Sequence, residues 1–396
     1  MEINKNVLYV GGFELPDKNA AAQRVIANGK LFSKLGYKVT FIGVDKDHYF
    51  YKPLMKKETI DGFNYNSKPQ KYPATKKDWL TFITSISFVK DTIKNDLEGN
   101  VDIIIAYNYP SVSLMRLINY CKKHNIKLIV DVTEWYEPNG NLFFKIIKGI
   151  DTYIRMNILH RKADGVLAIS KYLNDFYKDT NTLLLPPLVD KNSAKWSKVD
   201  CKPKDFSDLI YVGSPGNGFK DRIDVIILSL SKIKNSVRDF KFTIVGLTKS
   251  EYFTIFGRHS IPENVIDNVF FEGKKSHKDS IEKIKRADFS IFLRDNSLTN
   301  TAGFPTKFVE SITCGTPVLT NPSSNISQFL KDGKIGYLIN NIDNDNIDIS
   351  LINAINLGKK ELIEMKRECY SFKEFHFDFY EKEFAVFVSN LFKKDD

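Results

Sequence analysis

The sequence is poor in cysteine and histidine, and this limits the kinds of site it can build. It has only 4 cysteines and 6 histidines among 396 residues. The histidines do not recur at the short spacings of a metal site, so we expect no catalytic metal. The cysteines lie far apart, which favours reduced thiols in a cytoplasmic protein over a disulfide framework. They are Cys121, Cys201, Cys314 and Cys369.

Long apolar runs are also missing. No stretch of about 18 uninterrupted apolar residues is present, so we expect no membrane-spanning helix. The N-terminal MEINKNVLYVGG enters a predicted strand directly, without the apolar region and small-residue cleavage site of a signal peptide. We therefore expect a cytoplasmic protein, and we keep the inner face of the cell membrane as a second location.

Hydrophobic and basic residues are abundant. The chain is 42% hydrophobic and 13% aromatic, enough for a sizeable core in about two domains. Its net charge is +10, of which +7 belongs to residues 1–190 and +3 to the remainder. A basic first half fits an anionic partner such as a membrane surface, a lipid diphosphate or nucleic acid. A generally lysine-rich proteome would explain the same excess.

Apolar runs of strand length alternate with helical patterns along the whole chain, which is typical of a parallel α/β fold. A polar, lysine-rich stretch after Asp190 interrupts the alternation and predicts a linker. We therefore predict two Rossmann-like domains, residues 1–190 and 191–369, with their sheets facing a central cleft. The predicted strands are 7–10, 39–43, 102–106, 127–130, 165–169, 182–185, 209–212, 241–245, 268–271, 289–293, 317–320 and 336–339.

One segment, TAGFPTKFVESITCGTPVLT at 301–320, combines several features of an anion site. A Gly-Phe-Pro turn opens an amphipathic run, whose helix N-terminus offers free N–H groups and a positive dipole end to a diphosphate. Lys307 adds a positive charge, and Glu310 on the same face can accept hydrogen bonds from two sugar hydroxyls. A plain glycine-capped helix is the alternative. The donor-binding candidates here are Gly303, Phe304, Pro305, Thr306, Lys307 and Glu310.

The same segment resembles the donor-binding segment of retaining glycosyltransferases of the large family-4 type, which have the GT-B fold. The resemblance follows the variant pattern P-x-K-x-x-E-x-x-x-x-G-x-P, here Pro305, Lys307, Glu310, Gly315 and Pro317. It implies that Glu310 binds the ribose and Lys307 the phosphates of a nucleotide diphosphate sugar, with no further cofactor. The second glutamate of the more familiar pattern is replaced by Ala302.

A glycine-rich stretch after the strand at 209–212 is the second donor-side candidate. Gly213 allows the backbone to approach a phosphate, and Lys220 supplies charge. The resembling family has an arginine near Ser214, so this chain lacks one cation, and Arg222 or Arg294 is a candidate replacement. The stretch is neither a Walker loop nor a full dinucleotide fingerprint. Gly246 also ends a predicted strand, where the family stacks the nucleobase.

The first domain supplies the acceptor-side candidates. Gly11 and Gly12 follow the opening strand, and Arg24 lies in the next predicted helix (20–35). Asp131 and Glu134 follow a buried strand, close to where many family members place a histidine. We predict that one of the two acids takes that polar role, and we include Glu134 with Lys220 and Lys307 as catalytic candidates. A capped loop is the alternative.

Two amphipathic segments remain. Residues 141–162 place apolar side chains between lysines and arginines, which fits either an ordinary half-buried helix or a helix on an anionic membrane. We favour the half-buried helix. The aromatic tail at 370–396 predicts a closing helix that, in the resembling family, packs back on the first domain.

We therefore expect an enzyme that moves a sugar, with retention, from a nucleotide diphosphate donor to a glycan or lipid-linked glycan acceptor. A sugar-nucleotide 2-epimerase and a non-catalytic partner subunit share the expected architecture and remain alternatives. Nucleic acid is not an expected partner, because no recognised binding module accompanies the charge. The basic first domain suggests bacterial surface polysaccharide synthesis, by analogy with the family.

Overall fold

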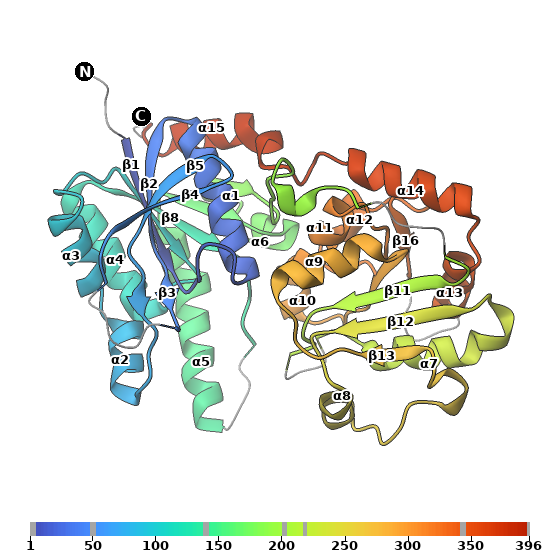
Figure 1. Ribbon diagram of the computed structural model, residues 1–396. Coiled ribbons are helices and arrows are strands. Elements are labelled where there is room, and N and C mark those ends of the chain that lie inside the picture. Colours follow the sequence, from blue (N-terminus) through green and yellow to red (C-terminus); the bar gives the residue numbers. More distant parts are fainter. Residues whose placement is uncertain are drawn as a thin grey trace. The chain divides into compact units, whose positions relative to one another are not determined.

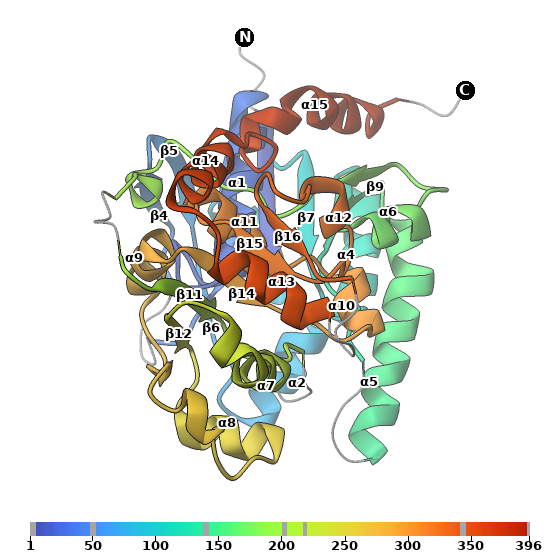
Figure 2. The same cartoon turned by 90° about the vertical axis from the view of Figure 1, so that its right-hand side faces the viewer.

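The fold is described from a computed structural model, which covers residues 5–47, 53–137, 142–199, 204–216, 220–340 and 346–393. The chain divides into two compact units (Figures 1 and 2). Unit 1 comprises Met1–Asp190 and His376–Asp396, and unit 2 comprises Lys191–Phe375. A division after residue 369 would cut the helix α14 (Lys359–Ser371), so unit 2 extends further than the sequence suggested. Cys201 and Asn141 lie outside the described residues.

Unit 1 is built on an eight-stranded sheet with the order β10-β9-β8-β7-β1-β2-β5-β4. Its neighbouring strands are parallel except for β4 and β5. Each predicted strand of the first half corresponds to one of these strands. Their bounds are β1 Lys5–Gly11, β2 Tyr37–Ile42, β4 Lys56–Ile60, β5 Phe63–Ser67, β7 Ile103–Tyr107, β8 Lys127–Val132, β9 Gly165–Ala168 and β10 Thr182–Leu184.

The segment at 49–77 is rich in lysine, tyrosine and proline, a composition that by itself indicates irregular structure. In its described part, β4 and β5 form an antiparallel hairpin that extends the main sheet. The turn is made by Asp61 and Gly62, both with positive φ. Phe63 and Tyr65 are buried and pack on Phe41 of β2, and this burial on alternate positions fixes the hairpin to the sheet. A short parallel pair, β3 (Val44–Asp45) and β6 (Gln70–Lys71), lies beside it.

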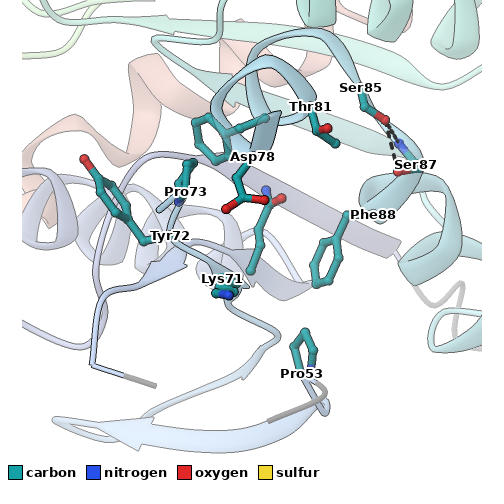
Figure 3. A pocket seen from close by; sticks show the side chains of 11 residues that line it. Pro53, Lys71, Tyr72, Pro73, Asp78, Thr81, Ser85, Ser87 and Phe88 are labelled. Carbon is teal, nitrogen blue, oxygen red and sulfur yellow. Dashed lines mark hydrogen bonds between the residues drawn. The ribbon is translucent and has the colours of Figure 1, made fainter. Parts of the chain in front are cut away.

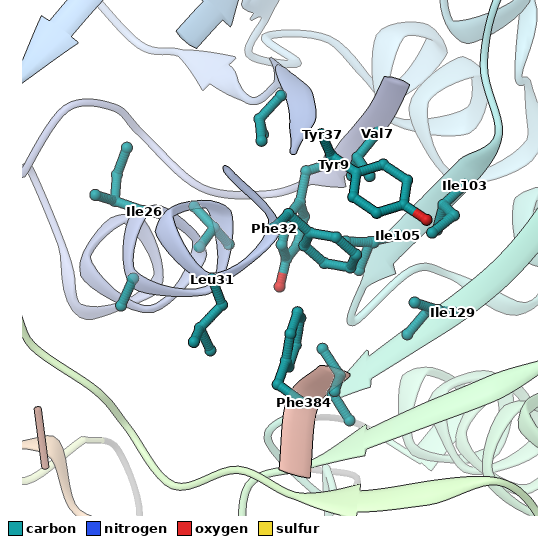
Figure 4. Close-up of a cluster of buried hydrophobic side chains, with 14 of the residues drawn as sticks. Val7, Tyr9, Ile26, Leu31, Phe32, Tyr37, Ile103, Ile105, Ile129 and Phe384 are labelled. Atoms are coloured by element: carbon teal, nitrogen blue, oxygen red, sulfur yellow. The ribbon is translucent and has the colours of Figure 1, made fainter. Parts of the chain in front are cut away.

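The helices of unit 1 cover this sheet and include the C-terminal helix. Phe384 of that helix packs edge-on against Phe32 at 4.8 Å and lies in the same core cluster as Ile105 and Ile129 (Figure 4). The prediction that the tail returns to the first domain is therefore confirmed. The helices are α1 Ala20–Lys34, α2 Lys76–Thr84, α3 Ser87–Asn95, α4 Ser111–His124, α5 Leu142–Ile154, α6 Lys171–Phe176 and α15 Glu381–Asn390.

Unit 2 is a six-stranded, fully parallel sheet with the order β13-β12-β11-β14-β15-β16. The six predicted strands of the second half all occur, which confirms the parallel α/β prediction. The order reverses between β11 and β14, and such a switch point is where open α/β sheets bind ligands. The strands are β11 Ser207–Val212, β12 Phe240–Val245, β13 Val269–Phe271, β14 Phe289–Phe292, β15 Val318–Thr320 and β16 Gly336–Leu338.

Most helices of unit 2 connect these strands, and the last two follow β16. Within the described part of the whole chain, none of the helices is long and apolar enough to cross a membrane. In unit 2 they are α7 Ile223–Ile233, α8 Lys249–Phe256, α9 His277–Arg286, α10 Leu298–Ala302, α11 Thr306–Thr313, α12 Ile326–Phe329, α13 Asn346–Ile355 and α14.

Candidate functional site

The helix α11 begins where the sequence places the Gly-Phe-Pro turn. Pro305 is the N-cap residue of this helix. Its side chain accepts no hydrogen bond from the first N–H groups of the helix, so it does not cap them. Gly303 ends α10, and the buried ring of Phe304 packs against Phe308 of α11 at 6.2 Å. This packing fixes the direction in which the N-terminus of α11 points, with Thr306 as its first residue.

Lys307 does not extend freely from α11 but reaches into a cluster of charged and aromatic side chains. Its Nζ lies 2.5 Å from Oδ2 of Asp221 and 4.2 Å from the centre of the Tyr211 ring. The Tyr211 hydroxyl donates to the same carboxylate oxygen at 2.8 Å, and Arg294 Nε lies 3.2 Å from Oδ1. Asp221, which the sequence analysis did not single out, is therefore the centre that holds two predicted donor-binding cations together.

Burial and charge set the protonation of this cluster. Burial opposes the ionisation of Asp221, yet Lys307 and Arg294 outweigh it and lower the pKa of the carboxyl to about 2. Burial also lowers the pKa of Lys307 to about 8, although Asp221 acts in the opposite direction. At neutral pH the cluster thus holds two cations and one anion, an excess of one positive charge at the switch point between β11 and β14.

Two glycines make room for this cluster. Gly213 follows β11 with φ +143°, and a Cβ there would lie 2.9 Å from Nζ of Lys307. Gly246 follows β12 with φ +104°, and a Cβ there would lie 2.2 Å from the carbonyl oxygen of Gly213. A side chain at either position would displace the backbone or the lysine, so both positions require glycine.

Glu310 lies one turn after Lys307 on α11 and is 9% exposed. Its Oε1 is 3.0 Å from Nε2 of His277, the first residue of α9. His277 is not predictable as a site residue from the sequence, because nothing in its own segment connects it to α11. The histidine holds one carboxylate oxygen and so orients the side chain of Glu310.

Some of the remaining donor-side candidates lie near Lys307, and others are paired with different residues. Lys220 lies close enough to lower the pKa of Lys307 by repulsion, and Ser214 is exposed beside Gly213. Arg222 instead forms ion pairs with Asp224 at 3.0 Å and Asp295 at 3.2 Å. Of the two arginines considered as replacements for the missing cation, only Arg294 shares a counter-ion with Lys307.

On the acceptor side, Arg24 and Asp131 form a buried ion pair in unit 1. Arg24 Nη2 lies 2.7 Å from Oδ1 of Asp131, and its Nη1 donates to the carbonyl of Leu185 at 2.8 Å. Tyr9 donates its hydroxyl to Asp131, and Asn28 donates to that hydroxyl at 3.0 Å. Arg24 is 2% exposed and Asp131 is fully buried. The network joins α1 to the sheet, and a role in acceptor binding stays a prediction for both residues.

Gly11 is the last residue of β1, and Gly12 follows it, beside the strand β7. Glu134 follows β8 and is half-buried. Burial, and next the Glu134 carboxylate, raise the pKa of Tyr136. β1 and β7 flank the point where the strand order of unit 1 reverses, so Gly11 and Gly12 lie where a ligand of this unit is expected.

A separate pocket of about 360 Å³ opens in unit 1 beside α2 and α3 (Figure 3). Tyr72, Asp78 and Phe88 line it, and Asp78 also accepts hydrogen bonds at the N-terminus of α2. None of the predicted donor or acceptor residues is among its lining residues. Among the described residues, no group of three or more histidines, cysteines and acids is arranged to hold a metal ion.

Comparisons with known proteins address the family profile and the fold. Residues 193–368 match the profile of the family Glycosyl transferases group 1. A comparison with curated proteins found no match.

Solved structures resemble the chain over nearly its whole length. Sucrose-phosphate synthase from Thermosynechococcus elongatus has a TM-score of 0.71 at 14% identity, covering 98% of this chain and 99% of that chain. A glycosyltransferase from Rickettsia africae has a TM-score of 0.65 at 16% identity, and the match covers 99% of this chain and 100% of that chain. Anabaena HepE in complex with UDP and glucose has a TM-score of 0.60 at 12% identity, and the match covers 98% of this chain and 100% of that chain.

At these identities the structural likeness shows the fold, and the family match covers most of unit 2. The chain therefore has the GT-B fold, and the family match concerns residues 193–368 alone.

Proposed function

We propose that this protein transfers a sugar, with retention of its anomeric configuration, from a nucleoside diphosphate sugar to an acceptor hydroxyl. The observation that carries the proposal is the cluster of Lys307 and Arg294 around Asp221, next to the N-terminus of α11. Glu310 lies three residues further along the same helix. HepE, which has the same fold, binds UDP and glucose, and we therefore take UDP as the first nucleotide to test.

The proposed chemistry is stabilisation of a leaving diphosphate. The acceptor oxygen bonds to the anomeric carbon, the bond from that carbon to the phosphate oxygen breaks, and a phosphate oxygen takes the acceptor proton. The negative charge that develops on the diphosphate would be met by Lys307, Arg294 and the amides of α11. Lys220 would add charge from the glycine-rich stretch. These cations perform the neutralising role that a metal ion has in other transferases.

Product analysis tests the proposal. The purified chain is incubated with candidate nucleotide sugars, with and without acceptors, and the products are separated. A transferase releases nucleoside diphosphate and forms a glycoside only when an acceptor is present. Conversion of the donor to its 2-epimer without an acceptor would favour the epimerase, and an unchanged donor across the panel would favour a non-catalytic subunit.

The pH dependence of donor binding follows from the cluster. Because Lys307 has a pKa of about 8, UDP affinity should fall as the pH rises through about 8 and the lysine loses its charge. Asp221 raises the pKa of Lys307, so Asp221→Asn should move this fall to lower pH. Calorimetric titration of UDP between pH 6 and 9.5 measures this dependence of affinity on pH in wild type and in Asp221→Asn. An identical profile in wild type and Asp221→Asn would contradict the assigned coupling.

The folded-state pKa of Asp221 also predicts acid sensitivity. Because that pKa is about 2, below the ordinary value of 3.8, Asp221 stabilises the fold above pH 4. The contribution is lost as the pH falls through about 2. Asp221→Asn should therefore show a weaker dependence of unfolding free energy on pH between 4 and 2.

We further propose that unit 1 works at an anionic membrane surface in the synthesis of a surface polysaccharide. Four large side chains of α5 are exposed, beside the exposed Lys145. The helix α2 lies toward the same end of the unit as the start of α5 (Figures 1 and 2), and its Trp79 and Leu80 are exposed. Exposed apolar side chains with flanking lysines suit adsorption to anionic lipid. The four residues of α5 are Ile146, Ile147, Ile150 and Tyr153.

Vesicle co-sedimentation tests this location. Wild-type protein should bind vesicles containing phosphatidylglycerol, and Ile146→Glu/Ile150→Glu should bind at least about tenfold more weakly because two apolar contacts become charged. Leu228→Glu, at an exposed position of α7 in unit 2, is the matched control. Equal binding by all three proteins, or none by wild type, would refute the surface assignment.

A further inference from the structure

Asp221 places a negative charge inside a site that, by the proposed function, binds an anion. It lies just before α7 and is 1% exposed. Its Oδ2 accepts hydrogen bonds from Lys307 Nζ at 2.5 Å and from the Tyr211 hydroxyl at 2.8 Å, and its Oδ1 accepts one from Arg294 Nε at 3.2 Å. The carboxylate therefore engages both cations that the proposed function assigns to the diphosphate.

The carboxylate of Asp221 is the main negative charge of this cluster. Among the described residues, it is the only carboxylate that forms an ion pair with Lys307 or Arg294. Tyr211 stays neutral, because burial and next the Asp221 charge raise its pKa. Lys307 is only 13% exposed and Arg294 only 6%, so water screens these pairs weakly. One buried acid thus cancels half of the positive charge of the two cations.

A phosphate that binds Lys307 comes close to Asp221. Its oxygen would lie about 2.8 Å from Nζ, and Nζ lies 2.5 Å from Oδ2, so the two anionic oxygens are at most about 5 Å apart. If Lys307 instead leaves Asp221 to follow the phosphate, the buried carboxylate keeps only Arg294 as its cation, which is also unfavourable. In both cases the carboxylate opposes negative charge on the ligand.

The two nucleotides of the proposed reaction differ in their negative charge. The outer phosphate of a nucleotide sugar is esterified by the sugar and carries a single charge. The same phosphate is free in the product, where it carries a charge of about −1.5 to −2 at pH 7. A site made of cations alone would therefore bind the product more tightly than the donor, because it attracts the additional charge.

We infer that Asp221 is a specificity-determining residue, which favours the nucleotide sugar over the free nucleoside diphosphate and so limits inhibition by the product. The inference rests on the proposed function, because it requires a diphosphate at Lys307. One pair of like charges about 5 Å apart changes a binding constant roughly fourfold in water and by more than roughly 100-fold at the effective permittivity of a protein surface. We expect an effect between these limits, of about tenfold.

Two uridine nucleotides that differ only in the charge of the outer phosphate test the inference. They are UDP and its β-methyl ester, which has the charge of a UDP-sugar without any sugar. At pH 6.5 the free outer phosphate of UDP carries most of its second charge. Calorimetric titration should show that Asp221→Asn raises the affinity for UDP about tenfold more than the affinity for the ester. A ratio of the two Kd values that stays at the wild-type value would overturn the inference.

A counter-ion that only holds Lys307 in place predicts a different result. Its removal would misplace the lysine and weaken both ligands by a similar factor, so that the ratio of their Kd values would not change. Asp221→Ala is the second variant, because it removes the charge without placing an amide N–H beside Lys307. It should shift the ratio in the same direction as Asp221→Asn, and a wild-type ratio in both variants assigns Asp221 a purely structural role.

Asp224→Asn is the matched control. Asp224 is also buried and lies three residues further along the chain, but it pairs with Arg222 at 3.0 Å and has no contact with Lys307. This variant should keep the wild-type ratio of the two Kd values. A shift as large as that of Asp221→Asn would mean that the net charge of unit 2 sets the preference, and would refute the role of Asp221.

Failure of the proposed function gives a separate outcome. If wild type binds neither UDP nor its ester, nor any other nucleoside diphosphate or its ester, the donor site is wrong and the inference falls with it. Binding of both ligands with an unchanged ratio in Asp221→Asn refutes the inference alone. In a transfer assay, the ratio of the UDP inhibition constant to the donor KM should fall about tenfold in Asp221→Asn.

Discussion

Lys307→Met is expected to lower donor turnover by about 10²- to 10³-fold, the usual cost of removing one group that stabilises transition-state charge. Lys307 supplies one of the two cations paired with Asp221. Methionine keeps a similar side-chain length against the ring of Tyr211 but carries no charge. The loss should appear in kcat with the donor saturating, because leaving-group charge develops in the transition state. Release of nucleoside diphosphate measures it.

Folding and function are separated by a second variant. Lys307→Met leaves Asp221 with Arg294 as its cation, so the stability loss should be smaller than the ~3–5 kcal/mol of an uncompensated buried charge. Lys307→Met/Asp221→Asn removes both charges and should recover part of that stability while activity stays low. Lys278→Ala, at an exposed position of α9, is the control. Near-normal turnover in Lys307→Met would exclude the lysine from the chemistry.

Glu310→Ala is expected to weaken donor binding by about 100-fold. In the proposed site the carboxylate accepts two hydroxyl hydrogen bonds, and at the lower end of the range of about 1.5–3 kcal/mol for each hydrogen bond to a charged group their loss corresponds to about 100-fold. Because these bonds form in the ground state as well as in the transition state, KM should rise more than kcat falls. Steady-state kinetics with the donor as the varied substrate give both constants.

Glu310→Gln and His277→Ala refine that result. Glutamine keeps one acceptor oxygen, so its effect should lie between wild type and alanine. His277 holds Oε1 of Glu310 at 3.0 Å, and its removal should cost less than the removal of Glu310 itself. An effect of His277→Ala larger than that of Glu310→Ala would mean that the histidine, and not the carboxylate, makes the important contact.

Much of the fold was predictable because it depends on local periodicity. The buried parallel strands read as short apolar runs, and α11 carries its own start signal in the Gly-Phe-Pro turn. The hairpin of β4 and β5 was not predictable, because Phe63 and Tyr65 are the only large apolar residues of β5 that are buried and their alternation is hidden among polar residues. Its register depends on contacts with Phe41, which the segment itself does not reveal.

The sequence motif of the candidate site was predictable from the sequence, whereas the counter-ions of its charged residues were not. Lys307 and Glu310 stand at fixed positions of one helix, so a pattern identifies them. Asp221 is 86 residues away from Lys307, and its burial is decided by how β11 and α7 pack, which the sequence does not display.

The central claim is that unit 2 binds a nucleoside diphosphate through Lys307. Thermal unfolding of wild type and Lys307→Met, each with a panel of nucleoside diphosphates, tests it most directly. We predict that at least one nucleotide raises the Tm of wild type and that Lys307→Met loses that rise. A panel that leaves the wild-type Tm unchanged, or a rise of equal size in the variant, would contradict the claim.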